Sequence, residues 1–117
     1  NTTESVQILL TAGADAMARG GNGWTPLHWA SSGGSYLNIE TLLAAGANVM
    51  ARGGDDWTPL HWAASSGTSD NIEVLLAAGA DAKAKSKDGK TPWDLAQENE
   101  EAEGTKGYWA LNDAQYN

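Results

Sequence analysis

The sequence contains no cysteine and no phenylalanine, and its charge is mostly of one sign. The absence of cysteine excludes disulfide bonds and thiolate chemistry. Asp and Glu number 15 against 7 Lys and Arg, so the formal net charge is −8. A surface this acidic repels phosphate backbones, which argues against nucleic-acid binding. No run of 18 apolar residues is present, so we expect no membrane-spanning helix.

The large apolar side chains are mainly tryptophan, leucine, isoleucine and valine, since there are 6 Trp and no Phe. The length fits one domain, and no basic-then-apolar signal segment opens the sequence. We expect a soluble monomer that binds no cofactor and no metal, and that is intracellular rather than secreted.

Two short motifs recur with a spacing of 33 residues. WTPLHWA occupies residues 24–30 and again 57–63, and KTPWDLA follows at 90–96. The second motif, AGAD or AGAN, occupies residues 12–15, 45–48 and 78–81. Two motifs that share one period between 20 and 50 residues indicate a repeat solenoid.

The same motifs mark helix boundaries. A threonine followed by a proline is typical of a helix N-terminus, because the hydroxyl can accept from an amide of the first turn and proline there loses no hydrogen bond. The helices are therefore expected to begin at Thr25, Thr58 and Thr91. Glycine suits the left-handed position that closes a helix, and the glycines in this position are Gly13, Gly46 and Gly79.

The period divides the sequence into a half repeat at 1–15, whole repeats at 16–48 and 49–81, and a C-terminal capping repeat at 82–117. Either the sequence is a piece of a longer array, or a short opening helix caps it. The first is favoured, because residues 6–10 carry the interior apolar pattern of a repeat. That pattern has i, i+3, i+4 spacing and comprises Val6, Leu9, Leu10, Ile39, Leu42, Leu43, Ile72, Leu75 and Leu76. In the cap we expect Tyr108, Trp109 and Leu111 to dock on the preceding repeat, while the acidic stretch 97–103 faces water.

The Gly-x-Thr-Pro-Leu-His-x-Ala and Leu-Leu-x-x-Gly-Ala-Asp/Asn phrases, with their 33-residue period, resemble the ankyrin repeat over essentially the whole chain. The resemblance implies an all-α solenoid of stacked helix-turn-helix units with β-turn fingers, whose concave side usually binds another protein. It also implies that the histidines bond to neighbouring backbone. The departures from the pattern are Asp56 for the finger glycine, Asp94 for histidine, and Ser35 and Thr68 where the family often has a second histidine.

The residues expected to contact a partner lie at the finger tips and bases and on the inner helices. They are Arg19, Asn22, Trp24, Ser32, Arg52, Asp55, Trp57, Ser65, Ser66, Lys85, Lys87 and Lys90. The alternative is a structural spacer or folding unit of a larger array, with no partner of its own.

Catalysis and metal binding are not expected. His28 and His61 are the only histidines, and equivalent positions on stacked helices lie about 8–10 Å apart, too far for one zinc ion with bonds of about 2 Å. Serines follow each histidine, but no Gly-x-Ser-x-Gly elbow is present. We therefore expect no enzyme activity.

The tryptophans and the basic residues each leave alternatives open. Trp29 and Trp62 are interpreted mainly as core or inter-helix packing, and Trp93 as core. For Trp24 and Trp57, partner contact and finger-to-finger stacking are both open. Equivalent basic residues stand at the finger bases, namely Arg19, Arg52 and Lys85. They either offset nearby carboxylates or form, with the tryptophans, a strip for an acidic or aromatic partner segment.

Overall fold

The described part of the chain is built from helices. The structure, a computed structural model, describes residues 25–33, 36–66, 68–100 and 102–116. Within these ranges the helices are α2 (Pro26–Gly33), α3 (Tyr36–Ala44), α4 (Pro59–Ser66), α5 (Ser69–Ala77), α6 (Pro92–Gln97) and α7 (Lys106–Ala114). The same ranges contain no strand, and none of their helices has the length and apolar character to cross a membrane. The expected half repeat at 1–15, with Val6, Leu9 and Leu10, lies outside the described residues.

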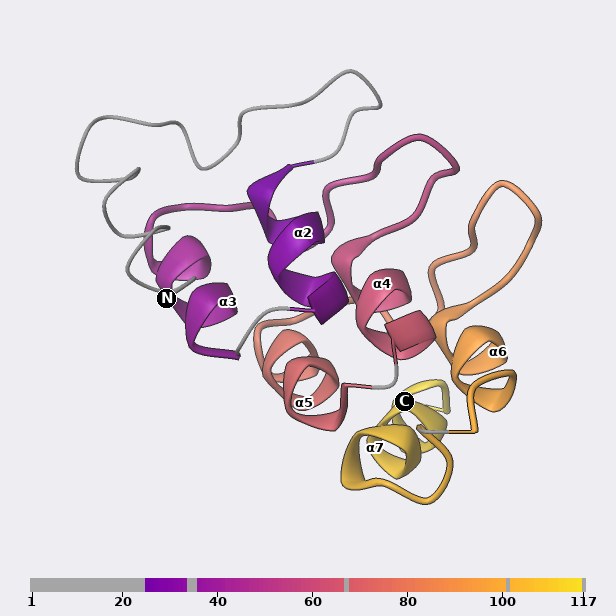
Figure 1. The fold of residues 1–117 in the computed structure, drawn as a ribbon. Coiled ribbons are helices and arrows are strands. Elements are labelled where there is room, and N and C mark those ends of the chain that lie inside the picture. Colours follow the sequence, from indigo (N-terminus) through magenta and orange to yellow (C-terminus); the bar gives the residue numbers. More distant parts are fainter. Residues whose placement is uncertain (1–24, 34–35, 67, 101, 117) are drawn as a thin grey trace.

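The helices lie in two layers (Figure 1). In one layer α2 packs on α4 and α4 packs on α6; in the other, α3 packs on α5 and α5 packs on α7. The segments 45–58 and 78–91 project as two loops on the side of α2, α4 and α6 (Figure 1). We refer to α2, α4 and α6 as the inner helices and to these two loops as the fingers. This all-α arrangement is the expected one.

The helix boundaries follow the sequence motifs. Each inner helix begins at a proline that directly follows a threonine. At the other end of the repeat motif, Gly46 and Gly79 both have φ of +96°. The amide of Ala47 donates to the carbonyl of Leu42, and the amide of Ala80 to that of Leu75, each at 3.0 Å. These bonds close α3 and α5 as Schellman motifs. The predicted helix ends are therefore confirmed at both glycines. Gly13 lies outside the described residues.

The tip of each finger is a tight hairpin with one left-handed residue. In the first finger, Asp56 donates to the Gly53 carbonyl at 2.9 Å, and Gly53 donates to the Trp57 carbonyl at 3.0 Å. Asp56 has φ of +60°, and Gly89, at the same place in the second finger, has +79°. The turn therefore survives with aspartate in a position that favours glycine, as expected for a residue that tolerates this region.

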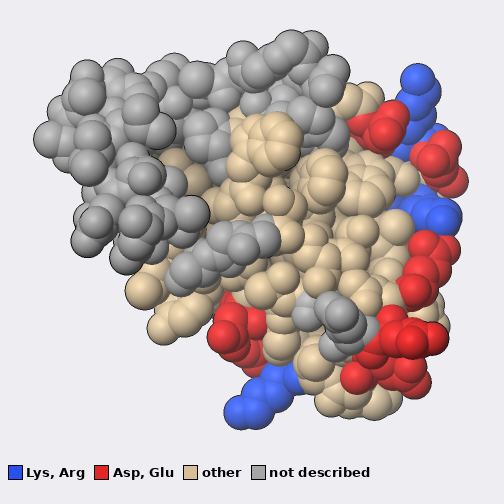
Figure 2. Space-filling model, viewed as in Figure 1, with Lys and Arg blue, Asp and Glu red and all other residues tan. Residues whose placement is uncertain are grey.

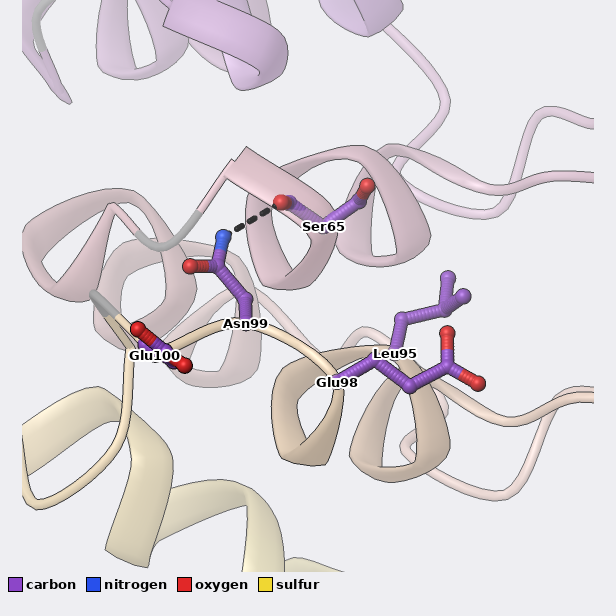
Figure 3. A pocket seen from close by; sticks show the side chains of 5 residues that line it. All are labelled: Ser65, Leu95, Glu98, Asn99 and Glu100. Carbon is purple, nitrogen blue, oxygen red and sulfur yellow. Dashed lines mark hydrogen bonds between the residues drawn. The ribbon is translucent and has the colours of Figure 1, made fainter.

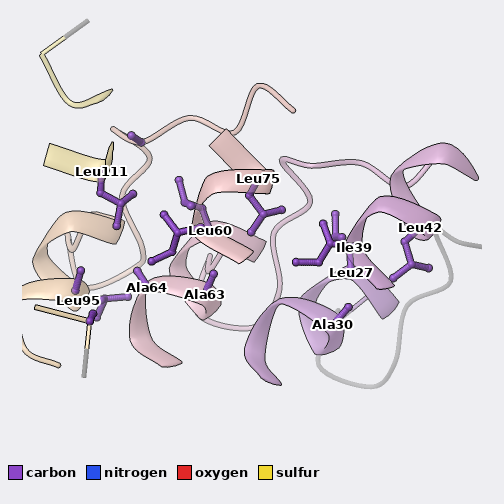
Figure 4. Close-up of a cluster of buried hydrophobic side chains, with 14 residues drawn as sticks. Leu27, Ala30, Ile39, Leu42, Leu60, Ala63, Ala64, Leu75, Leu95 and Leu111 are labelled. Carbon is purple, nitrogen blue, oxygen red and sulfur yellow. The ribbon is translucent and has the colours of Figure 1, made fainter. Parts of the chain in front are cut away.

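The core runs along the stack between the two layers (Figure 4). Leu27 and Leu60 come from the inner helices, and Ile39 and Ile72 from the outer ones; all four are fully buried. Alanines fill the space around the inner helices, where Ala30, Ala63 and Ala64 are buried. Leu42, Leu75 and Leu111 complete the buried leucines of the outer layer, and Leu43 and Leu76 pack at its edge, only partly buried.

The C-terminal helix docks differently from the prediction. Leu111 is fully buried, and Tyr108 is half-buried with its ring 4.6 Å from that of Trp93. Trp109, however, is 53% exposed and meets only the edge of Tyr108, with 5.0 Å between ring centroids. The prediction that Trp109 docks on the preceding repeat is wrong, because in an α-helix it points about 100° away from its neighbour Tyr108.

Candidate functional site

The two described fingers are joined to one another through their backbones. The amide of Lys87 donates to the carbonyl of Asp55 at 2.8 Å. Nη1 of Arg52 donates to the Asp56 carbonyl of its own finger and to the Lys85 carbonyl of the next finger, both at 2.9 Å. The contact residues predicted here are therefore brought together, but Arg52 acts as a brace between fingers. Sequence reasoning considered only its charge.

Both the side-chain ammonium and the backbone carbonyl of Lys90 make hydrogen bonds. Its Nζ lies 2.7 Å from Oε1 of Glu98, and this hydrogen bond and the charge of Glu98 raise the pKa of Lys90 above its ordinary value. Its carbonyl accepts a hydrogen bond from a ring nitrogen of His61 at 2.9 Å. Lys85 and Lys87 have exposed side chains, so the second finger presents two cations to solvent.

Trp57 packs against the inner helix that follows it. Its ring is stacked on His61 with centroids 6.0 Å apart and meets Trp62 edge-on at 5.0 Å. Trp57 is half-buried against the core cluster. The finger tryptophan therefore serves packing within its own repeat.

The inner helices carry an exposed indole that the sequence interpretation placed in the core. Trp29 of α2 is 67% exposed. Trp62, the equivalent residue of α4, is half-buried and covered in part by Trp57. The core assignment is wrong for Trp29, because the positions before and after it, His28 and Ala30, already point inward and turn its side chain to the surface.

The three predicted contact serines near the ends of the inner helices are partly buried. The Ser32 hydroxyl donates to the Trp29 carbonyl at 2.9 Å. The Ser65 carbonyl accepts from Nδ2 of Asn99 at 2.6 Å, and Ser66 is partly buried at the end of α4. In the same way, Nδ2 of Asn71 approaches the Ser31 carbonyl at 3.4 Å. The sequence analysis missed both asparagines, since only the stacking of units brings them to a carbonyl 34 or 40 residues earlier.

The two histidines link consecutive repeats. Nδ1 of His28 accepts from the Thr25 amide at 3.0 Å, and Nδ1 of His61 from the Thr58 amide at 3.1 Å. The other ring nitrogens lie 3.0 Å from the Trp57 carbonyl and 2.9 Å from the Lys90 carbonyl. An amide can only donate and a carbonyl can only accept, so each ring is neutral with its proton on Nε2.

Burial reinforces the neutral form at His61. The pKa of His61 is lowered from 6.5, chiefly because burial disfavours the charged ring; the positive charge of Arg52 lowers it further, while the bond to the Lys90 carbonyl opposes the shift. In the third unit Asp94 replaces histidine and closes a capping box with Thr91, at 2.9 and 3.3 Å. Both of these bonds lie within the third unit.

An open pocket of about 480 Å³ lies between the ends of α4 and α6. Ser65, Leu95, Glu98, Asn99 and Glu100 line it (Figure 3). Another, of about 290 Å³, lies on the outer layer among Tyr36, Asp70, Glu73 and Val74. In the described ranges no three His, Cys, Asp or Glu side chains gather in a way that could hold a metal ion.

Three predicted contact residues, Arg19, Asn22 and Trp24, lie outside the described residues.

The comparison with protein families agrees with the fold. A family model described as ankyrin repeats (3 copies) matches residues 1–86 and 42–106. No curated protein matches the sequence. The match covers most of the chain and accounts for the repeated finger and helix pair, so this chain belongs to the ankyrin-repeat family.

Proposed function

We propose that this chain binds another protein through its finger tips and the exposed face of its inner helices, and that it does so as a monomer. Ankyrin repeats are in general protein–protein interaction modules. The observation that carries the proposal is the exposure of Trp29, which is 67% exposed on an inner helix. A large rigid indole on a fixed scaffold is typical of residues that dominate the binding energy of an interface.

The fingers support the same proposal. Two hydrogen bonds join the two described fingers, from Arg52 to the Lys85 carbonyl at 2.9 Å and from the Lys87 amide to the Asp55 carbonyl at 2.8 Å. Loops that are ordered before binding lose less conformational entropy on association. We therefore keep Asp55, Lys85 and Lys87 as contact residues, and assign Arg52 the task of positioning them.

The division into units at 16–48, 49–81 and 82–117 is part of the proposal. It is supported by the recurrence of the same hydrogen bonds in α2 and α4, from a threonine amide to a histidine and from that histidine to the next finger. Because both histidines are committed to these structural bonds, we propose that neither serves catalysis.

The test compares two exposed tryptophans. Affinity capture with chemical cross-linking is carried out on three tagged chains: wild type, Trp29→Ala and Trp109→Ala. The thermal unfolding of each chain is also recorded. Trp109 is the matched control, because it is 53% exposed but lies on α7 of the outer layer. We expect Trp29→Ala to lose a partner that wild type and Trp109→Ala retain, with all three melting alike. If the three chains capture the same proteins in equal amounts, the inner-helix surface is not a binding site and the spacer alternative is favoured.

A further inference from the structure

We infer that the partner segment is basic. It lies across the inner helices, with an apolar side chain on Trp29 and Trp62 and with an arginine or lysine in the pocket beside Leu95. This inference rests on the proposed function and names the chemistry of its partner.

The first argument is a row of apolar residues that leads to the pocket. Trp29, Trp62 and Leu95 occupy the same position in α2, α4 and α6, and these helices pack side by side in that order. Exposure falls along the row, from 67% at Trp29, through the half-buried Trp62, to 7% at Leu95. Leu95 also lines the pocket between α4 and α6. A segment that contacts the exposed indole can therefore follow the row into the pocket.

The second argument is the sign of the potential in the pocket. Helices α4 and α6 both end there, and neither has a basic residue in its last turn. The C-terminal end of a helix carries a partial negative charge and favours cations. Glu98 and Glu100 add two carboxylates to the lining (Figure 3). Helix ends and side chains thus favour the same occupant, a cationic side chain.

Lys90 is the cation already beside this pocket, and it does not neutralise it fully. It contacts Oε1 of Glu98, and both side chains are about half exposed, at 45% and 56%. An ion pair this exposed is weak and exchanges readily with other partners. Glu100 provides a second carboxylate in the lining. An incoming cationic side chain can therefore contact either Glu98 or Glu100.

The third argument is the distribution of charge over the face seen in Figure 2. The centre of the described surface is uncharged, and acidic side chains are frequent along the edge near α6 and α7 (Figure 2). The net charge of the whole chain is −8, which steers a basic segment towards it. Arg52, which the sequence suggested as a receptor for an acidic partner, has Nη1 bonded to two backbone carbonyls. The inner-helix surface and the pocket at the C-terminal ends of α4 and α6 therefore suit a basic segment, while the exposed cations Lys85 and Lys87 lie on the second finger, which precedes the N-terminus of α6.

The experiment selects short random peptides, displayed on phage, against the immobilised chain. Peptides that combine Arg or Lys with an aromatic or branched aliphatic residue are expected to be enriched. An enriched peptide is then synthesised, and its affinity is measured by calorimetry at low and high salt. Binding is expected to weaken as salt rises, because salt screens exposed charges.

Matched charge variants locate the contact. Glu98→Gln/Glu100→Gln is expected to weaken peptide binding about tenfold at low salt. Asp70→Asn/Glu73→Gln removes the same charge from the outer-layer pocket and is expected to change affinity by less than about twofold, because that pocket lies on the other layer of helices and does not contact the proposed peptide. Trp29→Ala is expected to weaken binding about tenfold or more.

The outcomes separate this inference from the proposed function. If the enriched peptides are acidic or neutral yet still depend on Trp29, the inner-helix surface binds but the inference on charge is overturned. If the two charge variants weaken binding equally, the pocket is not the basic contact and the inference is also overturned. If Trp29→Ala leaves binding unchanged, the proposed function fails with it. Self-association in sedimentation that Trp29→Ala abolishes would assign the surface to a second copy and overturn the basic partner.

Discussion

Nε2 of His61 donates to the carbonyl oxygen of Lys90 at 2.9 Å, across 29 residues of chain. On the other side of the same ring, Nδ1 accepts from the Thr58 amide at 3.1 Å. The neutral His61 ring therefore bonds to the Thr58 amide at the N-terminus of its own helix and to the Lys90 carbonyl of the next finger. His28 makes the equivalent contacts one unit earlier, so the fingers and inner helices are positioned by the same repeated bond pattern.

Replacing His61 by alanine should destabilise the fold strongly. His61 is fully buried, and its loss leaves a cavity and leaves the buried Thr58 amide without its partner, while the Lys90 carbonyl keeps the hydrogen bond from the Ser86 amide. An unpaired buried amide costs about 1–3 kcal/mol, and the cavity adds to this cost, so we expect about 2–4 kcal/mol less unfolding free energy in urea denaturation. Gln97→Ala, at an exposed position, should stay within about 0.5 kcal/mol. Similar midpoints for the two variants would show that the histidine bonds contribute little.

Stability should fall as the pH falls below about 6.5. Burial holds the pKa of His61 below its ordinary 6.5 in the folded chain. The unfolded chain therefore binds a proton first on acidification, which favours unfolding; the stabilisation is complete above 6.5 and is lost as the pH falls towards the folded pKa. Urea midpoints measured from pH 7.5 to 5.5 should show this decrease, and His61→Ala should reduce its slope. An unchanged slope in the variant would assign the effect to other groups.

Two leucines should respond very differently to truncation. Leu75 of α5 is fully buried, whereas Leu37 of α3 is 47% exposed. Leu75→Ala leaves a cavity between the layers and should cost about 2–5 kcal/mol, enough to unfold an array this short. Leu37→Ala should cost much less, because solvent already reaches the side chain. Circular dichroism during urea unfolding measures both, and equal losses would contradict the position of the core.

Gly107→Ala should loosen the C-terminal helix. A Cβ at Gly107 would lie 2.8 Å from the Ser69 carbonyl oxygen and 2.9 Å from the Ser69 Cα. Alanine favours the helix itself by about 1 kcal/mol, but backbone atoms of α5 cannot move aside as a side chain can. We expect a net loss of about 1–3 kcal/mol, and Lys106→Ala, at the exposed neighbour, serves as control. Hydrogen exchange should show reduced protection in α7; a more stable variant would mean that α7 can shift without cost.

The sequence by itself determined the repeat, the helix boundaries and the buried stripe. Thr-Pro before a helix and glycine after one act within a few residues, so the N-termini of α2, α4 and α6 and the positive φ of Gly46 and Gly79 were predictable. The period of 33 residues then implied that equal units stack. These features depend on local conformation and on the side of a helix that a residue occupies.

Only the tertiary structure decided how each surface residue is used. Trp29 was exposed rather than buried, and Arg52 joined two carbonyls from different fingers. Asn99 reached the Ser65 carbonyl, and Glu98 and Glu100 came to line a pocket beside it. The physical reason is that these contacts link residues in neighbouring units, so they depend on the distance and angle between stacked repeats, which local preferences and an apolar pattern do not specify.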